Sequence, residues 1–345
     1  MTADLRDRPV DEVVAEAGVS AAIGLKHVAS LLFTYRCTIA CQHCLFNCSP
    51  KRPDVCVSFE DGVEFMRQLR ETDRCIHIAG GEAMMYYDEM MAICRAANEI
   101  GAAPHFIETN ASWCKSEEIA ETQYTELLET GVSGVLISAD PYHQRFVPPE
   151  RRERAYRWAV QVFGEKNVAA SNVSLERLQE YREIGRDPER VAEYSREHPP
   201  RFVGRAGEDL ASASPDRPLA DLADDPLWHG GNQTRHCRSE FDADDMWEIH
   251  IDPYGNIQTC CGIVIGDAHE KSLIEWMERG LHTDNELVRM AYEEGPYAFL
   301  DLARSRGYEP REAYPQKCAM CWEARKFLRP EFPETFGPAE IYDPV

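Results

Sequence analysis

The chain has 345 residues, of which 43% are hydrophobic and 28% are charged, and this composition is typical of a globular protein rather than a disordered one. Its formal net charge of -23 argues against a nucleic-acid partner, because binding to a phosphate backbone requires a basic surface. The sequence opens without a signal peptide and has no apolar stretch of the roughly 18 residues that a membrane helix needs. We therefore expect a cytoplasmic protein with a small-molecule or peptide substrate and no membrane partner.

The first two thirds of the chain alternate short apolar runs with helical periods. Residues 1–27 predict a helical leader, and the run that follows predicts the first strand. We expect strands at 28–35, 75–79, 104–108, 134–138, 167–172 and 201–205, and helices at 59–70, 88–100, 117–130, 149–163 and 175–196, the last broken at Asp187-Pro188. Six strand–helix alternations favour a parallel sheet that curves into a barrel. The predicted fold is therefore α/β, with a partial (β/α)6 TIM-like barrel at residues 28–207.

The last third of the chain has a different pattern. Residues 208–236 are rich in Ala, Asp, Ser and Pro, which indicates a connector or a lid. Alternating apolar residues at 246–251 and 257–261 flank an Asp-Pro-Tyr-Gly-Asn turn and predict a β-hairpin, and a helix is expected near 272–279. We expect residues 237–328 to form a small domain of hairpin plus helix, followed by a Pro-rich tail at 329–345.

Thirteen cysteines in a chain without an export signal indicate metal or redox chemistry rather than disulfides. Cys37, Cys41 and Cys44 form a C-x3-C-x2-C motif directly after the first predicted strand. Three thiolates can hold an iron–sulfur cluster and leave one iron without a protein ligand. A zinc site is the alternative, although zinc usually takes four ligands from paired C-x2-C motifs.

This cysteine triplet, its place after the first strand and the six alternating units resemble the radical S-adenosylmethionine (SAM) superfamily. The resemblance implies that Cys37, Cys41 and Cys44 hold a 4Fe-4S cluster whose open iron binds SAM. It also implies reductive cleavage of SAM to a 5'-deoxyadenosyl radical, hydrogen abstraction from a substrate, and an electron donor such as flavodoxin or ferredoxin.

The same resemblance implies SAM-binding roles for residues near the cluster and at the strand ends. Gly80-Gly81-Glu82 follows the second strand, where relatives bind the SAM ammonium group, and His43 takes the position beside the adenine. Ala111 departs from the Thr-Asn-Gly that relatives show after the third strand. The strand-end residues with expected cofactor contacts, each of which could instead be a turn or helix cap, are Asn110, Ser138, Asp140, Ser171, Asn172 and Arg205.

Four later cysteines, Cys237, Cys260, Cys318 and Cys321, are sufficient for a closed four-thiolate site. Their arrangement resembles the twitch module, a shortened SPASM-like module, and this resemblance implies one auxiliary 4Fe-4S cluster. Cys261 could replace Cys260 as a ligand. A structural zinc ion is the alternative occupant.

Catalytic residues are harder to assign. Cys48, Cys56 and Cys114 lie in predicted loops, where a thiol could donate a hydrogen atom to a substrate radical or be inert. Tyr142 and His143 follow the fourth strand and could contact substrate or transfer protons.

The resulting hypothesis is a radical SAM oxidoreductase or radical-rearrangement enzyme that abstracts hydrogen from a small metabolite or a peptide. The short leader offers no room for a separate leader-recognition domain, which favours a small or unleadered substrate. The alternatives are a maturase or epimerase of ribosomally made peptides (RiPPs) and an inactive barrel-fold binding protein with a structural metal site.

Overall fold

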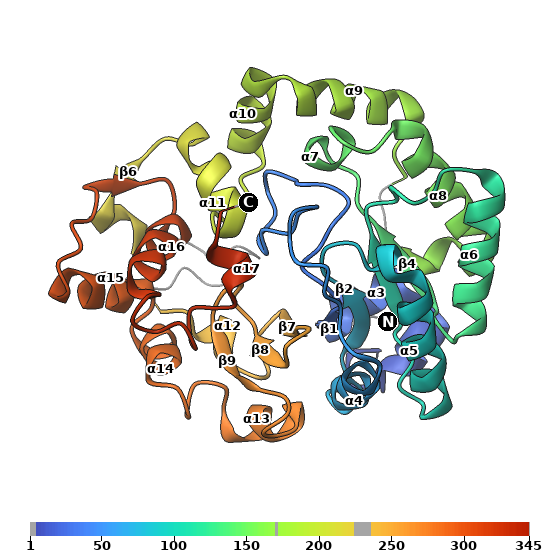
Figure 1. Ribbon diagram of the computed structural model, residues 1–345, viewed down its shortest axis with the longest axis horizontal. Coiled ribbons are helices and arrows are strands. Elements are labelled where there is room, and N and C mark those ends of the chain that lie inside the picture. Colours follow the sequence, from blue (N-terminus) through green and yellow to red (C-terminus); the bar gives the residue numbers. More distant parts are fainter. Residues whose placement is uncertain (1–4, 170–171, 224–235, 345) are drawn as a thin grey trace. The chain divides into compact units, whose positions relative to one another are not determined.

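The structure is a computed structural model that describes residues 5–169, 172–223 and 236–344, and every structural statement below refers to these residues (Figure 1). Contacts divide the chain into two units. The first comprises Met1–Ile39, Ser49–Asp187 and Glu248–Gly255, and the second comprises Ala40–Cys48, Pro188–Trp247 and Asn256–Val345. No helix of the described ranges combines the length and apolarity that crossing a membrane would require.

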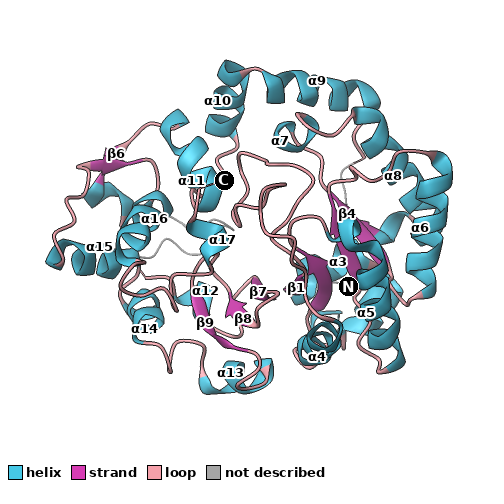
Figure 2. Ribbon diagram, viewed as in Figure 1, coloured by secondary structure: helices cyan, strands magenta, loops and turns pink. Residues whose placement is uncertain are grey.

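The first unit is built on parallel strands (Figure 2). Their order in the sheet is β5-β4-β3-β2-β1-β7, and each neighbouring pair is parallel. The strands are β1 (Val28–Leu32), β2 (Cys75–Ala79), β3 (Phe106–Thr109), β4 (Gly134–Ile137), β5 (Val168–Ala169) and β7 (Glu248–Ile251). This arrangement confirms the predicted α/β class and its parallel sheet.

Helices precede, connect and follow these strands. They are α2 (Val10–Ala17), α3 (Val19–Lys26), α4 (Phe59–Arg70), α5 (Tyr87–Glu99), α6 (Glu117–Glu129), α7 (Pro141–Gln144), α8 (Pro149–Phe163) and α9 (Leu175–Arg186). Local sequence explains several helix starts, because the hydroxyl groups of Ser58, Ser116 and Ser174 accept backbone hydrogen bonds at the first turns of α4, α6 and α9. The expected break at Asp187-Pro188 is also present, since α9 ends at Arg186.

The two faces of the sheet differ in chemistry. Strand alternation and register place Leu31, Ile78 and Ile107 on one face, which is apolar and buried, as is typical of a face covered by helices. The opposite face carries polar and charged side chains, namely Ser30, His77, Glu108, Glu248 and His250.

The second unit contains helices and two short antiparallel pairs. Strand β8 (Asn256–Gln258) pairs with β9 (Val264–Asp267), and β6 (Arg217–Pro218) pairs with β10 (Ala313–Tyr314). The helices are α10 (Pro188–Glu197), α11 (Gly204–Asp209), α12 (Arg238–Phe241), α13 (Leu273–Arg279), α14 (Glu286–Glu293), α15 (Pro296–Ser305), α16 (Lys317–Leu328) and α17 (Ala339–Tyr342).

One predicted strand is wrong. Residues 201–205 form no strand, because Gly204 has a φ of 57° and begins helix α11. The sixth parallel strand is instead β7, which pairs with β1 through Val28 and Glu248. The expected turn after β7 is confirmed, since the Gly255 N–H donates to Asp252 O at 3.0 Å and Gly255 has a φ of 86°.

Candidate functional site

The Gly80-Gly81 pair brings the end of β2 against the segment that follows β1. The Gly81 N–H donates to Thr34 O at 2.7 Å, and Gly80 has a φ of 121°. A Cβ atom on Gly81 would lie 1.9 Å from Arg36 O, so no larger residue fits without moving the backbone. The glycines therefore set the close approach on which the position of Glu82 depends.

Glu82 is a buried carboxylate held at the strand ends. It is 1% exposed, and it accepts hydrogen bonds from Thr109 Oγ1 and from the Asn110 N–H, both at 2.8 Å. Burial raises its pKa to about 7, against the opposing effect of these two hydrogen bonds. A cation beside Glu82 would favour the ionised form, so the site is suited to an ammonium group.

Asn110 links Glu82 to the first cysteine. Its Nδ2 atom donates to Cys37 Sγ at 3.5 Å and to Thr38 Oγ1 at 3.1 Å. The next residue, Ala111, has a φ of 63°, a left-handed conformation that costs an L-residue about 1 kcal/mol or more. The turn after β3, where the resemblance stated above led us to expect Gly, is therefore formed here with Ala.

The residues expected after β4 contact one another. Asp140 caps α7 by accepting from the His143 N–H at 3.0 Å, and its second oxygen lies 2.7 Å from His143 Nδ1. Tyr142 is buried, and the Ser138 N–H donates to Thr109 O at 3.1 Å. Asp140 thus has the helix-cap role that the sequence left open.

Two further expected residues follow β5. Asn172 is exposed, and Ser171 lies outside the described residues.

Two loop thiols of the first unit differ in burial. Cys114 is fully buried, which raises its pKa to about 11. Cys56 is half-buried, and burial raises its pKa as well. Both groups therefore keep their S–H bond near neutral pH.

The segment with Cys41, His43 and Cys44 belongs to the second unit, whereas Cys37 belongs to the first. The Cys44 N–H donates to Cys41 O at 3.1 Å, and the Cys48 N–H donates to Cys44 Sγ at 3.3 Å. The hydrogen bond from the Cys48 side chain lowers the pKa of the Cys44 thiol. Cys44 is thereby favoured as a thiolate.

Arg205 holds this cysteine segment by its backbone. Its guanidinium group donates to the carbonyl groups of Cys41 and Asn47, each at 3.0 Å, and of Cys48 at 2.8 Å. The Arg205 N–H also donates to Cys44 O at 3.0 Å. The observed contacts of Arg205 are thus with the segment that carries two of the motif cysteines, a role that the sequence analysis did not anticipate.

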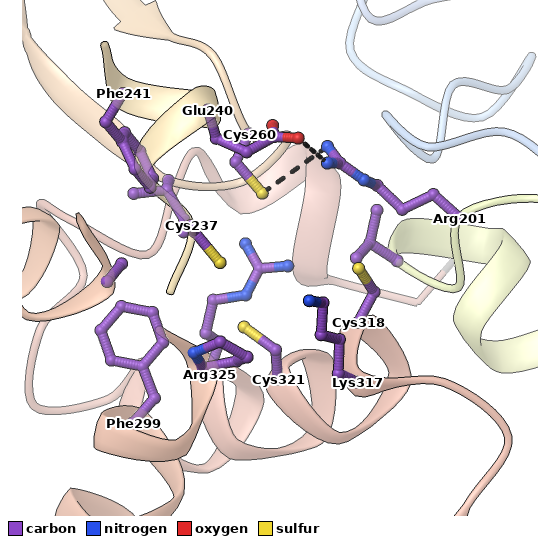
Figure 3. A pocket seen from close by; sticks show the side chains of 14 residues that line it. Arg201, Cys237, Glu240, Phe241, Cys260, Phe299, Lys317, Cys318, Cys321 and Arg325 are labelled. Atoms are coloured by element: carbon purple, nitrogen blue, oxygen red, sulfur yellow. Dashed lines mark hydrogen bonds and ion pairs between the residues drawn. The ribbon is translucent and has the colours of Figure 1, made fainter. Parts of the chain in front are cut away.

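Cys237, Cys260, Cys318 and Cys321 line one cavity of the second unit (Figure 3). Cys318 and Cys321 come from the first turns of α16, Cys260 follows β8, and Cys237 precedes α12. Cys261 does not line this cavity, and its carbonyl group accepts from Arg325 Nη1 at 2.9 Å. The geometry therefore favours Cys260 over Cys261 as the fourth thiol.

Charged side chains surround the four thiols. Arg201 forms an ion pair with Glu240 and lies with Nη1 at 3.9 Å from Cys260 Sγ, while Lys317 and Arg325 also line the cavity. Burial raises the pKa of the Cys237 thiol, and it raises that of Cys321 to about 12. Metal binding at this site must therefore displace protons from buried thiols.

Sequence analysis missed the polar face of the parallel sheet. His77 Nε2 lies 2.9 Å from Glu248 Oε1, and His250 Nδ1 forms a hydrogen bond with Ser30 Oγ. Glu108, one residue before Thr109, has its pKa raised by burial. The sequence does show polar residues at alternate positions of these otherwise apolar strands. Periodicity within one strand, however, does not indicate that polar residues of different strands share one face of the sheet.

Comparisons with known proteins give a family for the barrel segment. Residues 31–187 match the radical SAM superfamily. None of the curated proteins compared with the chain matched it.

Two solved structures resemble the chain at low identity. The structure described as BtrN in complex with AdoMet and 2-DOIA is 16% identical, with a TM-score of 0.45, and the match covers 79% of this chain and 89% of that one. The structure described as native anSMEcpe with bound AdoMet and Cp18Cys peptide is 11% identical, with a TM-score of 0.38, and the match covers 89% of this chain and 96% of that one. The family match covers residues 31–187, which contain the cysteine motif and Gly80-Gly81-Glu82, so this segment of the chain is similar to the radical SAM superfamily.

Proposed function

We propose that this protein cleaves SAM reductively at a 4Fe-4S cluster held by Cys37, Cys41 and Cys44, and that the resulting radical abstracts hydrogen from a substrate. The observation that carries the proposal is the chain of contacts from Glu82 through Asn110 to Cys37 Sγ. In this chain of contacts a single residue, Asn110, lies between a proposed cluster ligand and a buried carboxylate that is suited to the SAM ammonium group.

The donor set fits such a cluster. Three cysteines are available in the motif, and the pKa of Cys44 is lowered toward the thiolate that iron requires. When bound, the cluster would supply the electron that cleaves SAM. Glu82 would bind the ammonium group, Asn110 would orient Cys37, and Arg205 would fix the backbone around Cys41 and Cys44.

The second set of cysteines supports an auxiliary 4Fe-4S cluster on Cys237, Cys260, Cys318 and Cys321. Four thiols lining one cavity are the donors that such a cluster needs. The cavity also contains buried arginine nitrogens that have no hydrogen-bond partner among the described residues, as expected if sulfur atoms of a bound group accept from them.

For the substrate we propose a small polar metabolite or a short peptide. The support is the polar sheet face with His77, Glu108, Glu248 and His250, which offers hydrogen-bond acceptors on and beside strand β3, the strand that ends at Thr109. An electron donor such as flavodoxin or ferredoxin would reduce the SAM-binding cluster.

The test is spectroscopy of anaerobically reconstituted protein, with electron paramagnetic resonance recorded before and after addition of SAM. We expect a cluster signal that changes on adding SAM and 5'-deoxyadenosine that forms with reductant. The Cys37→Ala/Cys41→Ala/Cys44→Ala variant should lose both, whereas Cys94→Ala, which removes a buried thiol of α5, should keep both. Undiminished 5'-deoxyadenosine from the triple variant would contradict the proposal.

A further inference from the structure

The four-cysteine cavity of the second unit carries an excess of buried positive charge. Arg201, Lys317 and Arg325 are 5%, 1% and 0% exposed, and the acidic residue in the lining is Glu240, at 5%. These side chains together carry two more positive than negative charges. Buried charges need compensation, and four neutral thiols provide none.

Four thiolates around a doubly charged metal centre would compensate this excess. Their four negative charges, less the two positive charges of a zinc ion or of an oxidised 4Fe-4S core, leave two negative charges. The buried guanidinium groups of Arg201 and Arg325 would favour such a dianionic metal–thiolate centre, and charge alone does not distinguish zinc from iron.

Arg325 provides the more specific observation. Its Nη1 atom donates to Cys261 O, whereas its Nε and Nη2 atoms are buried and have no hydrogen-bond partner among the described residues. Arg325 also forms no ion pair with a carboxylate there. Figure 3 shows its guanidinium group directed into the space that the sulfur atoms surround.

Helix α16 explains how this donor reaches the sulfur atoms. Cys318, Cys321 and Arg325 are spaced three and four residues apart, so they lie on one face of the helix. Across the cavity, Arg201 Nη1 lies 3.9 Å from Cys260 Sγ, and Arg201 Nε is buried without a partner. Two guanidinium groups with unpartnered N–H donors thus line the cavity that the four thiols share.

Hydrogen bonds to cluster sulfurs and nearby positive charge raise a cluster's reduction potential, because the reduced form carries one more negative charge. We propose that Arg325, assisted by Arg201, is a positioning residue that donates N–H···S hydrogen bonds to the auxiliary cluster and raises its reduction potential. This inference rests on the auxiliary 4Fe-4S cluster of the proposed function. The cluster then takes up one electron, without a proton, more readily than four thiolates alone would allow.

The experiment uses full-length protein with Cys37, Cys41 and Cys44 replaced by Ala, so that only the second site can hold iron. Its midpoint potential is measured by dithionite titration followed by electron paramagnetic resonance, in this background and with Arg325→Met or Arg325→Lys added. Arg329→Met is the matched control. Arg329 directly follows the last residue of α16, and it forms an ion pair with Asp343 instead of lining the cavity.

We expect Arg325→Met to reduce the ratio of reduced to oxidised cluster at least tenfold at a fixed potential, which is about 59 mV for a one-electron couple. Arg325→Lys should restore part of the shift because it keeps the charge, and Arg329→Met should leave the potential unchanged. Pulsed resonance in deuterated buffer should also show an exchangeable proton coupled to the reduced cluster that Arg325→Met removes.

An unchanged potential in an Arg325→Met protein that keeps its iron would overturn this inference and leave the proposed function intact. Zinc without iron in the triple-variant background would overturn the auxiliary cluster itself. If Arg325→Met loses its iron, because Arg325 also contacts Cys261 O and Trp322, Arg201→Met provides the same comparison. A potential in Arg201→Met equal to that of the background would then reject the proposal.

Discussion

Burial changes the titration of the Glu82 carboxylate. The two hydrogen bonds that it accepts are not enough to offset desolvation, so its pKa lies near 7 rather than at its usual value of 4.5. The carboxyl group is therefore partly protonated near neutral pH until a positive charge approaches. Its affinity for that charge must depend on pH.

The first prediction is that SAM binds more tightly as pH rises through about 7, because the ionised Glu82 carboxylate attracts the ammonium group. Glu82→Gln should bind SAM more weakly and lose this pH dependence.

Without SAM, the raised pKa has the opposite effect on stability: the folded state holds the Glu82 proton more tightly than the unfolded state does. The free energy of unfolding should therefore fall as pH rises from 4.5 to about 7, by roughly 3 kcal/mol relative to Glu82→Gln.

Calorimetric titration with SAM and denaturant unfolding, each at several pH values, measure the two effects. Equal pH dependence of SAM binding in the wild-type protein and in Glu82→Gln would contradict the assignment.

The second prediction separates two adjacent cysteines. Cys260 lines the four-thiol cavity and Cys261 does not, although both cysteines follow the same short strand, β8. Cys260→Ser should therefore remove most of the metal from the second site, and Cys261→Ser should leave it in place. Iron and zinc analysis of both variants in the Cys37/Cys41/Cys44 triple-Ala background decides between them. Loss of metal from Cys261→Ser alone would reverse the assignment.

At the scale of elements, the start of helix α11 holds the cysteine segment of the second unit. Gly204 has a φ of 57°, and an added Cβ atom would lie 2.1 Å from Leu45 O. Arg205 then donates to the carbonyl groups of Cys41 and Cys48. The position of this segment is therefore coupled to the position of α11.

The third prediction is that Gly204→Ala displaces the segment and lowers SAM-dependent cluster chemistry without abolishing folding. The iron content should fall from about eight toward about four atoms per chain, since the second site has its own ligands. Gly24→Ala is the control, because an added Cβ atom there meets no atom within 4 Å. The same SAM-dependent signal and iron content in Gly204→Ala as in Gly24→Ala would refute the coupling.

Elements defined by local sequence were predictable, and those defined by distant pairing were not. The break at Asp187-Pro188 and the alternation of strands and helices depend on neighbouring residues, and the structure confirms them. The strand predicted at 201–205 is wrong, because an apolar run in the sequence does not indicate which strand, if any, it would pair with. Strand β7 takes the sixth place because it pairs with β1, more than 200 residues away in the chain.

In the candidate site, too, features set by local sequence were predictable and contacts between distant residues were not. Spacing alone marks Cys37, Cys41 and Cys44, because three ligands of one metal cluster can be close in sequence. The contact between Asn110 and Cys37 joins two strand ends, and the hold of Arg205 on Cys41 spans 164 residues. Such contacts depend on the tertiary fold, which local patterns do not encode.

At the scale of the whole molecule, the proposed function requires two metal centres with separate ligand sets. The motif near the start of the barrel supplies three cysteines, and the second unit supplies four more around its own cavity. None of these seven residues is shared between the two sets. Each centre should therefore be removable without loss of the other.

The last prediction is that the wild-type protein carries about eight irons as two 4Fe-4S clusters, whereas either set of ligand variants carries about four. The Cys37/Cys41/Cys44 triple-Ala variant should lose 5'-deoxyadenosine formation, because the iron that is open to SAM belongs to that set. A variant with Cys237, Cys260, Cys318 and Cys321 replaced by Ala should keep a signal that responds to SAM, provided that it folds. Iron analysis, circular dichroism and resonance spectra of the three proteins test this division. Loss of all iron from the triple variant would show that the two sets depend on each other, and zinc in place of its remaining iron would show that the second centre is structural rather than redox-active.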